Sequence, residues 1–262
     1  MVCGSSRRPP TSRGDPEIVV TTWLVPGALG LTILVGALTM RATGLGFALI
    51  ASPFLALIFG PFEGVLIANV CGAASAMLNL TQVHRHIDWR RARLLVPAGI
   101  LGIIPGALAA RLLPAAPLSI VVSCVVIVGL TVTVIIRQVA IADSPVIAAT
   151  GGLASGFMNA TAGVGGPGLV IYALATKWDY SNFAATAQVI FAVQGIASLA
   201  LKWAWPHLTP VDWMVVACAL GVGLVAGSLL ARRINPRIAM GAVIVIAAIG
   251  AVVGLVQGIQ RL

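Results

Sequence analysis

The sequence predicts an all-α, polytopic integral membrane protein, from its composition and from the character of its apolar runs. Of the 262 residues, 59% are hydrophobic and 9% are charged, whereas soluble domains carry roughly 25% charged residues. The apolar runs are long and do not alternate with a period of two, which excludes a transmembrane β-barrel. Because hydrocarbon offers no hydrogen bonds to the backbone, the remaining spanning structure is the α-helix.

We expect about eight to ten transmembrane or re-entrant helices, since a full crossing needs about 20 residues. Three of the apolar segments are short or borderline and are rich in glycine or interrupted by proline, so whether they cross or re-enter stays open. Before the first segment, residues 1–17 are polar and are expected to form a disordered tail. The segments lie near 18–40, 44–60, 64–82, 94–112, 117–136, 145–160, 164–176, 183–201, 213–231 and 238–257, of which 44–60, 145–160 and 164–176 are the short ones.

The segments divide into two membrane repeats, 18–140 and 141–262. The stretch Thr43-Gly44-Leu45-Gly46 corresponds to Ala162-Gly163-Val164-Gly165, 119 positions later, and Asn69 corresponds to Gln188 at the same offset. Internal repeats are the usual construction of secondary transporters. Five crossings in each half would make the halves inverted, and four would make them parallel. The sequence leaves both arrangements open.

Two further boundaries resemble each other, because Asp88-Trp89 and Asp212-Trp213 each precede or open an apolar run. An aspartate just before a helix can cap its free N–H groups, and tryptophan is favoured at the headgroup level of a bilayer. We therefore expect an interfacial helix start, capped by aspartate, at both places.

Charge and cysteine usage limit the partners. The net charge is +9, but the basic residues lie between apolar spans. We therefore expect no nucleic-acid binding, which needs an exposed basic face. Arg85, Arg90, Arg91 and Arg93 give the strongest signal for the cytoplasmic side of the membrane. The four cysteines show no metal-ligand spacing. We expect a lipid bilayer as partner, no cofactor, metal or disulfide, and leave a homo-oligomer open.

The two glycine-rich stretches are the first candidate for a binding site. Glycine costs a helix about 1 kcal/mol relative to alanine and an interior proline about 3 kcal/mol. Inside a membrane, unwound backbone is tolerated where protein or a water-filled cavity satisfies it, and the free N–H groups of a half-helix suit an anion. The alternative is close helix packing through small residues. The candidate residues are Arg41, Thr43, Gly44, Gly46, Asn159, Thr161, Gly163, Gly165, Gly166 and Pro167.

Buried amides are the second candidate. Asn69, Gln188 and Gln194 fall within predicted spans, where amides either hold helices together or line a cavity. Arg41 adjoins the first glycine break, where it attracts an anion or extends to the interface. We find no nucleophile, metal cluster or acid–base pair at membrane depth and expect no catalytic residue.

The duplicated glycine breaks, the polar third span, the basic loop and the Gly102-to-Gly106 spacing of the fourth span resemble the sulfite exporter TauE/SafE family. The resemblance covers roughly residues 25–258. It implies a permease that moves sulfite, sulfonates or related sulfur-containing organic anions across the bacterial inner membrane. We expect such a small anion to bind between the halves and to cross by alternating access, with uptake or export left open. The alternatives are a membrane-embedded enzyme or assembly factor, and an anion channel.

Overall fold

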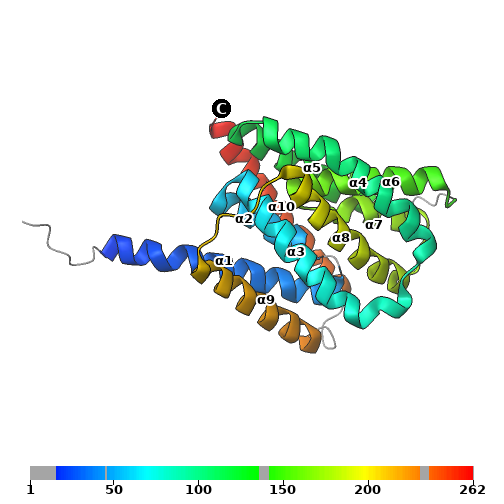
Figure 1. Ribbon diagram of the computed structural model, residues 1–262, viewed down its shortest axis with the longest axis horizontal. Coiled ribbons are helices and arrows are strands. Elements are labelled where there is room, and N and C mark those ends of the chain that lie inside the picture. The colour runs from blue at the N-terminus through cyan, green and yellow to red at the C-terminus, as the bar shows by residue number, and fades with distance from the viewer. Residues whose placement is uncertain (1–15, 45, 136–141, 231–235, 262) are drawn as a thin grey trace, which may run out of the picture.

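The computed structural model describes residues 16–44, 46–135, 142–230 and 236–261. This part of the chain forms ten α-helices and one short 3-10 helix and contains no strand (Figure 1). The elements are α1 (Pro16–Thr43), α2 (Gly46–Phe59), α3 (Pro61–Val83), η1 (His84–His86), α4 (Trp89–Leu112), α5 (Ala115–Ile135), α6 (Pro145–Ala162), α7 (Gly166–Ala175), α8 (Tyr180–Lys202), α9 (Pro210–Leu230) and α10 (Pro236–Gln260).

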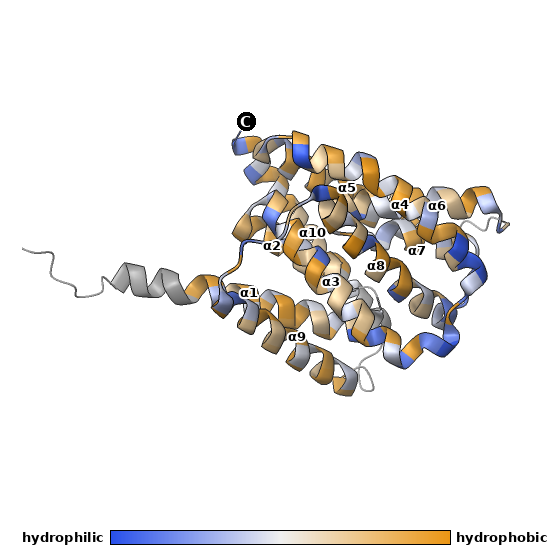
Figure 2. Cartoon of the chain, in the orientation of Figure 1, coloured by the Kyte–Doolittle hydropathy of each residue, from blue (hydrophilic) through white to orange (hydrophobic). Residues whose placement is uncertain are grey.

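The prediction of an all-α, polytopic membrane protein is confirmed. In the described ranges, six helices are long and apolar enough to cross a bilayer, namely α1, α3, α4, α5, α8 and α9. Apolar residues predominate along the helices, whereas polar residues gather around η1 (Figure 2). The predicted disordered tail, 1–17, lies outside the described residues except for Pro16 and Glu17, which begin α1.

The two expected aspartate caps have different outcomes. Asp88 caps α4 as predicted, since its side chain accepts a hydrogen bond from the Arg91 N–H at 3.2 Å. The prediction for Asp212 is wrong, because α9 begins two residues earlier, at Pro210. Proline is well suited to a first helical position. Thr209 and Asp212 then bond each other's backbone N–H groups, at 3.2 and 3.1 Å, in the manner of a capping box.

Consecutive helices run in opposite directions. Gly36 of α1 packs against Phe47 and Ala51 of α2, and Gly151 of α6 packs against Tyr172 of α7, so each pair is a tight hairpin. Contacts between distant helices give further directions. Asp88 and Gly99 of α4 meet Thr186 and Gln194 of α8, which makes these helices parallel, and α8 runs antiparallel to α3. We call the end of the bundle that carries η1 the basic end, and the end that carries Gly60 and residues 203–209 the far end. The helices α6–α10 then run opposite to α1–α5, element by element.

The helices of the two halves pack in reciprocal pairs. Figure 1 shows α1 beside α9, and these helices are parallel, with Gly223 and Gly227 of α9 against Leu34 and Leu38 of α1. In the same way α4 packs parallel to α6, whereas α3 packs on α8 and α5 packs on α10 in the antiparallel orientation. If each helix is replaced by its counterpart in the other half (α1 by α6, α2 by α7 and so on), the same set of pairs results. The internal repeat remains a prediction, and this arrangement is what an inverted repeat would produce.

Candidate functional site

Both predicted glycine breaks occur, as the tips of two helical hairpins. The first hairpin turns at Gly44, with φ of 73°, between α1 and α2, and the second turns at Gly163, with φ of 69°, between α6 and α7. Residues that carry a side chain rarely adopt this left-handed backbone conformation, whereas glycine adopts it freely. The helix α7 has 10 residues and is therefore about 15 Å long, half of a bilayer's hydrocarbon thickness of about 30 Å.

Each half supplies a side chain that holds the tip of the other half. Gln188 of α8 donates from Nε2 to the Gly44 carbonyl at 2.9 Å. Ser52 of α2 donates to the Ala162 carbonyl, next to Gly163. These bonds satisfy carbonyls that the unwound turns expose, as backbone at membrane depth requires. The second tip is also held within its own half, where the Ser155 hydroxyl lies 2.8 Å from the Gly165 carbonyl.

A central cavity lies between the two tips. Its empty space, including its mouth, is about 360 Å³. Residues of both halves form its wall, and several are glycine or alanine, whose lack of a long side chain leaves the space open. The lining residues are Met40, Phe47, Ala48, Ala68, Asn69, Gly72, Ala73, Asn159, Gly163, Gly165, Phe191 and Gly195.

Two buried amides give this wall unused hydrogen-bonding capacity. Asn69 is 2% exposed and Asn159 is 6% exposed, and the Oδ1 atom of each has no hydrogen-bond partner. The Asn69 Nδ2 group donates to the Ser198 hydroxyl at 3.1 Å. Because a hydroxyl donates as well as accepts, Ser198 would also support the opposite rotamer, in which Asn69 presents its NH₂ group. A buried polar group left unpaired costs about 1–3 kcal/mol, so a polar ligand in the cavity would be stabilised.

The cavity wall carries partial rather than full positive charge. None of its described lining residues is Asp, Glu, Lys, Arg or His. The helix α7 begins at this wall, with Gly165 as its N-cap residue and Pro167 in its first turn. The first N–H groups of a helix have no intrahelical acceptor, and they form a site suited to an anion. The wall therefore offers uncharged hydrogen-bond donors of the kind that suits a small anion.

The structure places some of the predicted residues beside the cavity and others away from it. Gly44 and Gly46 form the first tip and the start of α2, and Gly166 and Pro167 begin α7. The Gln188 Oε1 atom is buried and unpartnered. Gln194 packs against the second tip, where its Oε1 lies 3.1 Å from the Ser155 hydroxyl and its Nε2 has no partner.

Arg41 and Thr161 make their bonds elsewhere. The Arg41 guanidinium donates to Asn79 Oδ1 at 2.7 Å and to Gln82 Oε1, both on α3 toward the basic end. The Thr161 hydroxyl donates to the Phe157 carbonyl of its own helix at 2.8 Å. The Thr43 side chain is outside the described part of the structure. A direct role of Arg41 and Thr161 in binding would thus need a different conformation.

Several residues of the site were not predicted from the sequence. Phe47 and Phe191 line the cavity, yet in sequence they resemble any apolar residue of a span. Ser52 and Ser155 hold the second tip. A hydroxyl within an apolar run is a weak signal of such a role, because serine also packs helices together.

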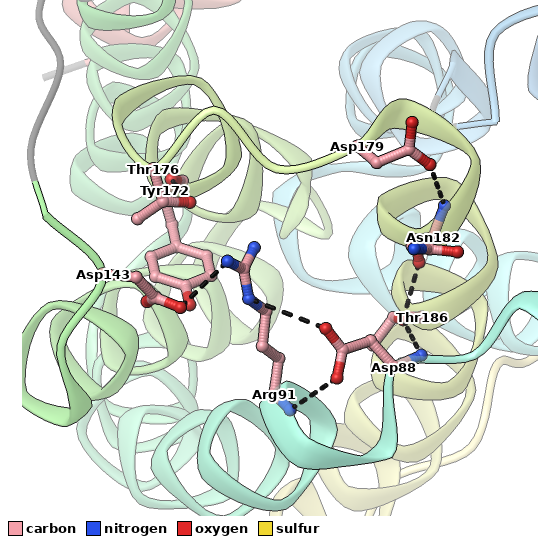
Figure 3. A network of polar contacts seen from close by, with 8 residues as sticks. All are labelled: Asp88, Arg91, Asp143, Tyr172, Thr176, Asp179, Asn182 and Thr186. Atoms are coloured by element: carbon pink, nitrogen blue, oxygen red, sulfur yellow. Dashed lines mark hydrogen bonds and ion pairs between the residues drawn. The ribbon is translucent and has the colours of Figure 1, made fainter.

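A second polar cluster joins the halves at the basic end (Figure 3). Arg91 of α4 pairs with Asp143, just before α6, at 2.9 Å, and lies 4.5 Å from the centroid of the Trp178 ring. Asp143 also accepts a hydrogen bond from the Tyr172 hydroxyl at 2.7 Å. Asp88 flanks Arg91 at 3.7 Å. The cluster links α4 of the first half to α6 and α7 of the second.

The comparison with known families gives one match. The family model described as Sulfite exporter TauE/SafE matches residues 28–259, nearly the whole chain. Neither the curated proteins nor the solved structures compared with this chain include a match.

Proposed function

Because the chain belongs to the sulfite exporter TauE/SafE family, we propose that it carries sulfite or an organosulfonate across a bacterial inner membrane by alternating access. Membership makes the protein a multi-pass membrane transporter of a small anion and not an enzyme. The substrate, the mechanism and the binding site are our proposal. Its single main support is the central cavity, which lies between two broken hairpins and has unpaired amide groups in its wall.

The donors of the cavity suit the chemistry of the substrate. A sulfonate presents three oxygen atoms that accept hydrogen bonds and carry the negative charge. Asn69 and Asn159 can turn their NH₂ groups toward such oxygens, and the N-terminus of α7 adds backbone N–H groups. Hydrogen bonds to a charged group contribute about 1.5–3 kcal/mol each. Donors without full charge bind an anion and still allow its release, which a carrier needs.

The arrangement of the halves supports alternating access. Inverted repeats with discontinuous helices around a site near the bilayer midplane are typical of secondary transporters, and one bundle rocks against the other. In this chain α1–α5 and α6–α10 run in opposite directions, and each half holds the other's tip through Gln188 and Ser52. The Arg91–Asp143 pair would close the basic end in the conformation seen.

Removing the cavity amides is expected to weaken transport. We predict that Asn69→Ala and Asn159→Ala each raise the half-saturating concentration for the substrate about tenfold or more, because each loses a bond to the anion. The measurement is uptake and counterflow of labelled sulfite, sulfoacetate and taurine in proteoliposomes. Counterflow by the wild type also separates a carrier from a channel.

A matched control for these variants is Gln260→Ala, which removes an exposed amide at the end of α10. It should transport like the wild type. If both asparagine variants also retain wild-type half-saturation for every transported anion, the cavity is not the binding site.

A further inference from the structure

Lys202 is a buried cation that the proposed site does not use. It is the last residue of α8 and is 2% exposed. Its Nζ atom has no hydrogen-bond partner among the described residues. A lysine at the end of a membrane helix ordinarily extends its ammonium group to the interface. Lys202 does not, because the protein covers it almost completely.

The position of Lys202 connects the central cavity to the far end. Ser198 lies one turn earlier on α8, and residues four apart share a helix face. Ser198 is 0% exposed and accepts the hydrogen bond from Asn69, which lines the cavity. One face of α8 therefore runs from the cavity wall to the buried ammonium group.

The nearby acid at this end does not neutralise Lys202. Glu63, in the first turn of α3, instead pairs with His207. The His207 Nδ1 atom lies 2.7 Å from the Glu63 Oε1 atom. The His207 backbone N–H also points to Glu63 Oε2 at 3.4 Å. This contact ties the segment that follows Lys202 to α3 and leaves the ammonium group without a carboxylate.

A buried ammonium group without a partner is costly, so the group either gives up its proton or binds a counter-ion. Ionisable residues at membrane depth commonly mark ion pathways. We infer that Lys202 is a second anion-binding position, at which the transported sulfite or sulfonate binds between the central cavity and the far end. The inference rests on the proposed function and adds a separate site to it. An anionic lipid headgroup offers the same chemistry, and the experiment distinguishes the two sources.

The first test is transport by three lysine variants. Lys202→Met should raise the half-saturating concentration about tenfold or more for whichever of sulfite, sulfoacetate and taurine the wild type carries, whereas Lys202→Arg, which keeps the charge, should stay within about threefold. Lys177 is the other lysine of the sequence and is exposed, so Lys177→Met is the control and should be unchanged. Each variant is checked for a single symmetric peak in gel filtration.

The second test counts binding positions with the same labelled anion on purified protein. Saturation binding should give two anions per wild-type chain, and one per Lys202→Met chain. The assay is repeated in vesicles of phosphatidylcholine with and without phosphatidylglycerol. A Lys202→Met defect that appears only with phosphatidylglycerol would assign the ammonium group to lipid and overturn the inference.

The outcomes separate the two proposals. If the wild type carries none of the three compounds, the proposed function fails and the inference fails with it. If the wild type transports an anion and Lys202→Met does so with unchanged half-saturation and stoichiometry, the cavity proposal stands and the Lys202 site is refuted.

Discussion

Replacing Gly72 with leucine is expected to reduce anion transport at least a hundredfold while the protein stays folded. Gly72 lines the central cavity, and a Cβ atom there would meet Phe47 at 3.7 Å, an ordinary contact distance. The first carbon of the new side chain therefore fits, and the remaining carbons extend into the space that the substrate would need. A loss of about 2.7 kcal/mol or more in substrate affinity corresponds to a hundredfold.

Counterflow in proteoliposomes measures this effect, and gel filtration and melting temperature report on folding. Gly221→Leu is the matched control, because Gly221 lies on the exposed side of α9 and a Cβ atom there would meet nothing within 4 Å. Transport by Gly72→Leu within a factor of three of the wild type would show that the anion passes elsewhere.

The second large effect concerns the packing between halves. Gly156→Ala should destabilise the protein by about 3 kcal/mol, because its Cβ atom would lie 1.9 Å from the Gly99 carbonyl oxygen of α4. Backbone rather than a movable side chain blocks the site, so α4 and α6 must separate. The same clash would occur from the side of α4, because a Cβ atom added at Gly102 would lie 2.1 Å from the Leu153 carbonyl oxygen of α6.

The yield of monodisperse protein and its melting temperature in detergent test this prediction. We expect Gly156→Ala to melt roughly 6–12 °C below the wild type, from a shift of about 2–4 °C per kcal/mol for a chain of this size. Gly27→Ala is the control, since Gly27 has nothing within 4 Å of an added Cβ atom. A Gly156→Ala protein with the melting temperature of the control would mean that α4 and α6 are not this close.

Much of the fold follows from local sequence. Long apolar runs locate the spans, and glycine at positions 44 and 163 predicts the two tips because the left-handed turn there suits glycine. Asn69 could be selected because an amide in a membrane span needs a partner. Each of these features is determined by residues that lie within about one helix length along the sequence.

Other features depend on contacts between distant residues, and the sequence could not supply them. Apolar residues that face lipid and those that face a cavity are chemically alike, so Phe47 and Phe191 gave no signal. Arg41 binds the side-chain amides of Asn79 and Gln82, which lie 38 and 41 positions away along the chain. That the two halves run in opposite directions could be established only once the direction of each helix was known. Thr209 rather than Asp212 caps α9, because the helix begins earlier than expected, at Pro210.

The most direct test of a shared, alternately open cavity is the two-sided accessibility of one residue in its wall. Ala73 lines the cavity and is 6% exposed. A single cysteine is placed there in a chain whose native cysteines are replaced by alanine, and an impermeant sulfonated thiosulfonate reagent is added to oriented vesicles from one side or the other. The account predicts reaction from both sides, slowed by the transported sulfonate. Reaction from one side alone, or from neither, would contradict it.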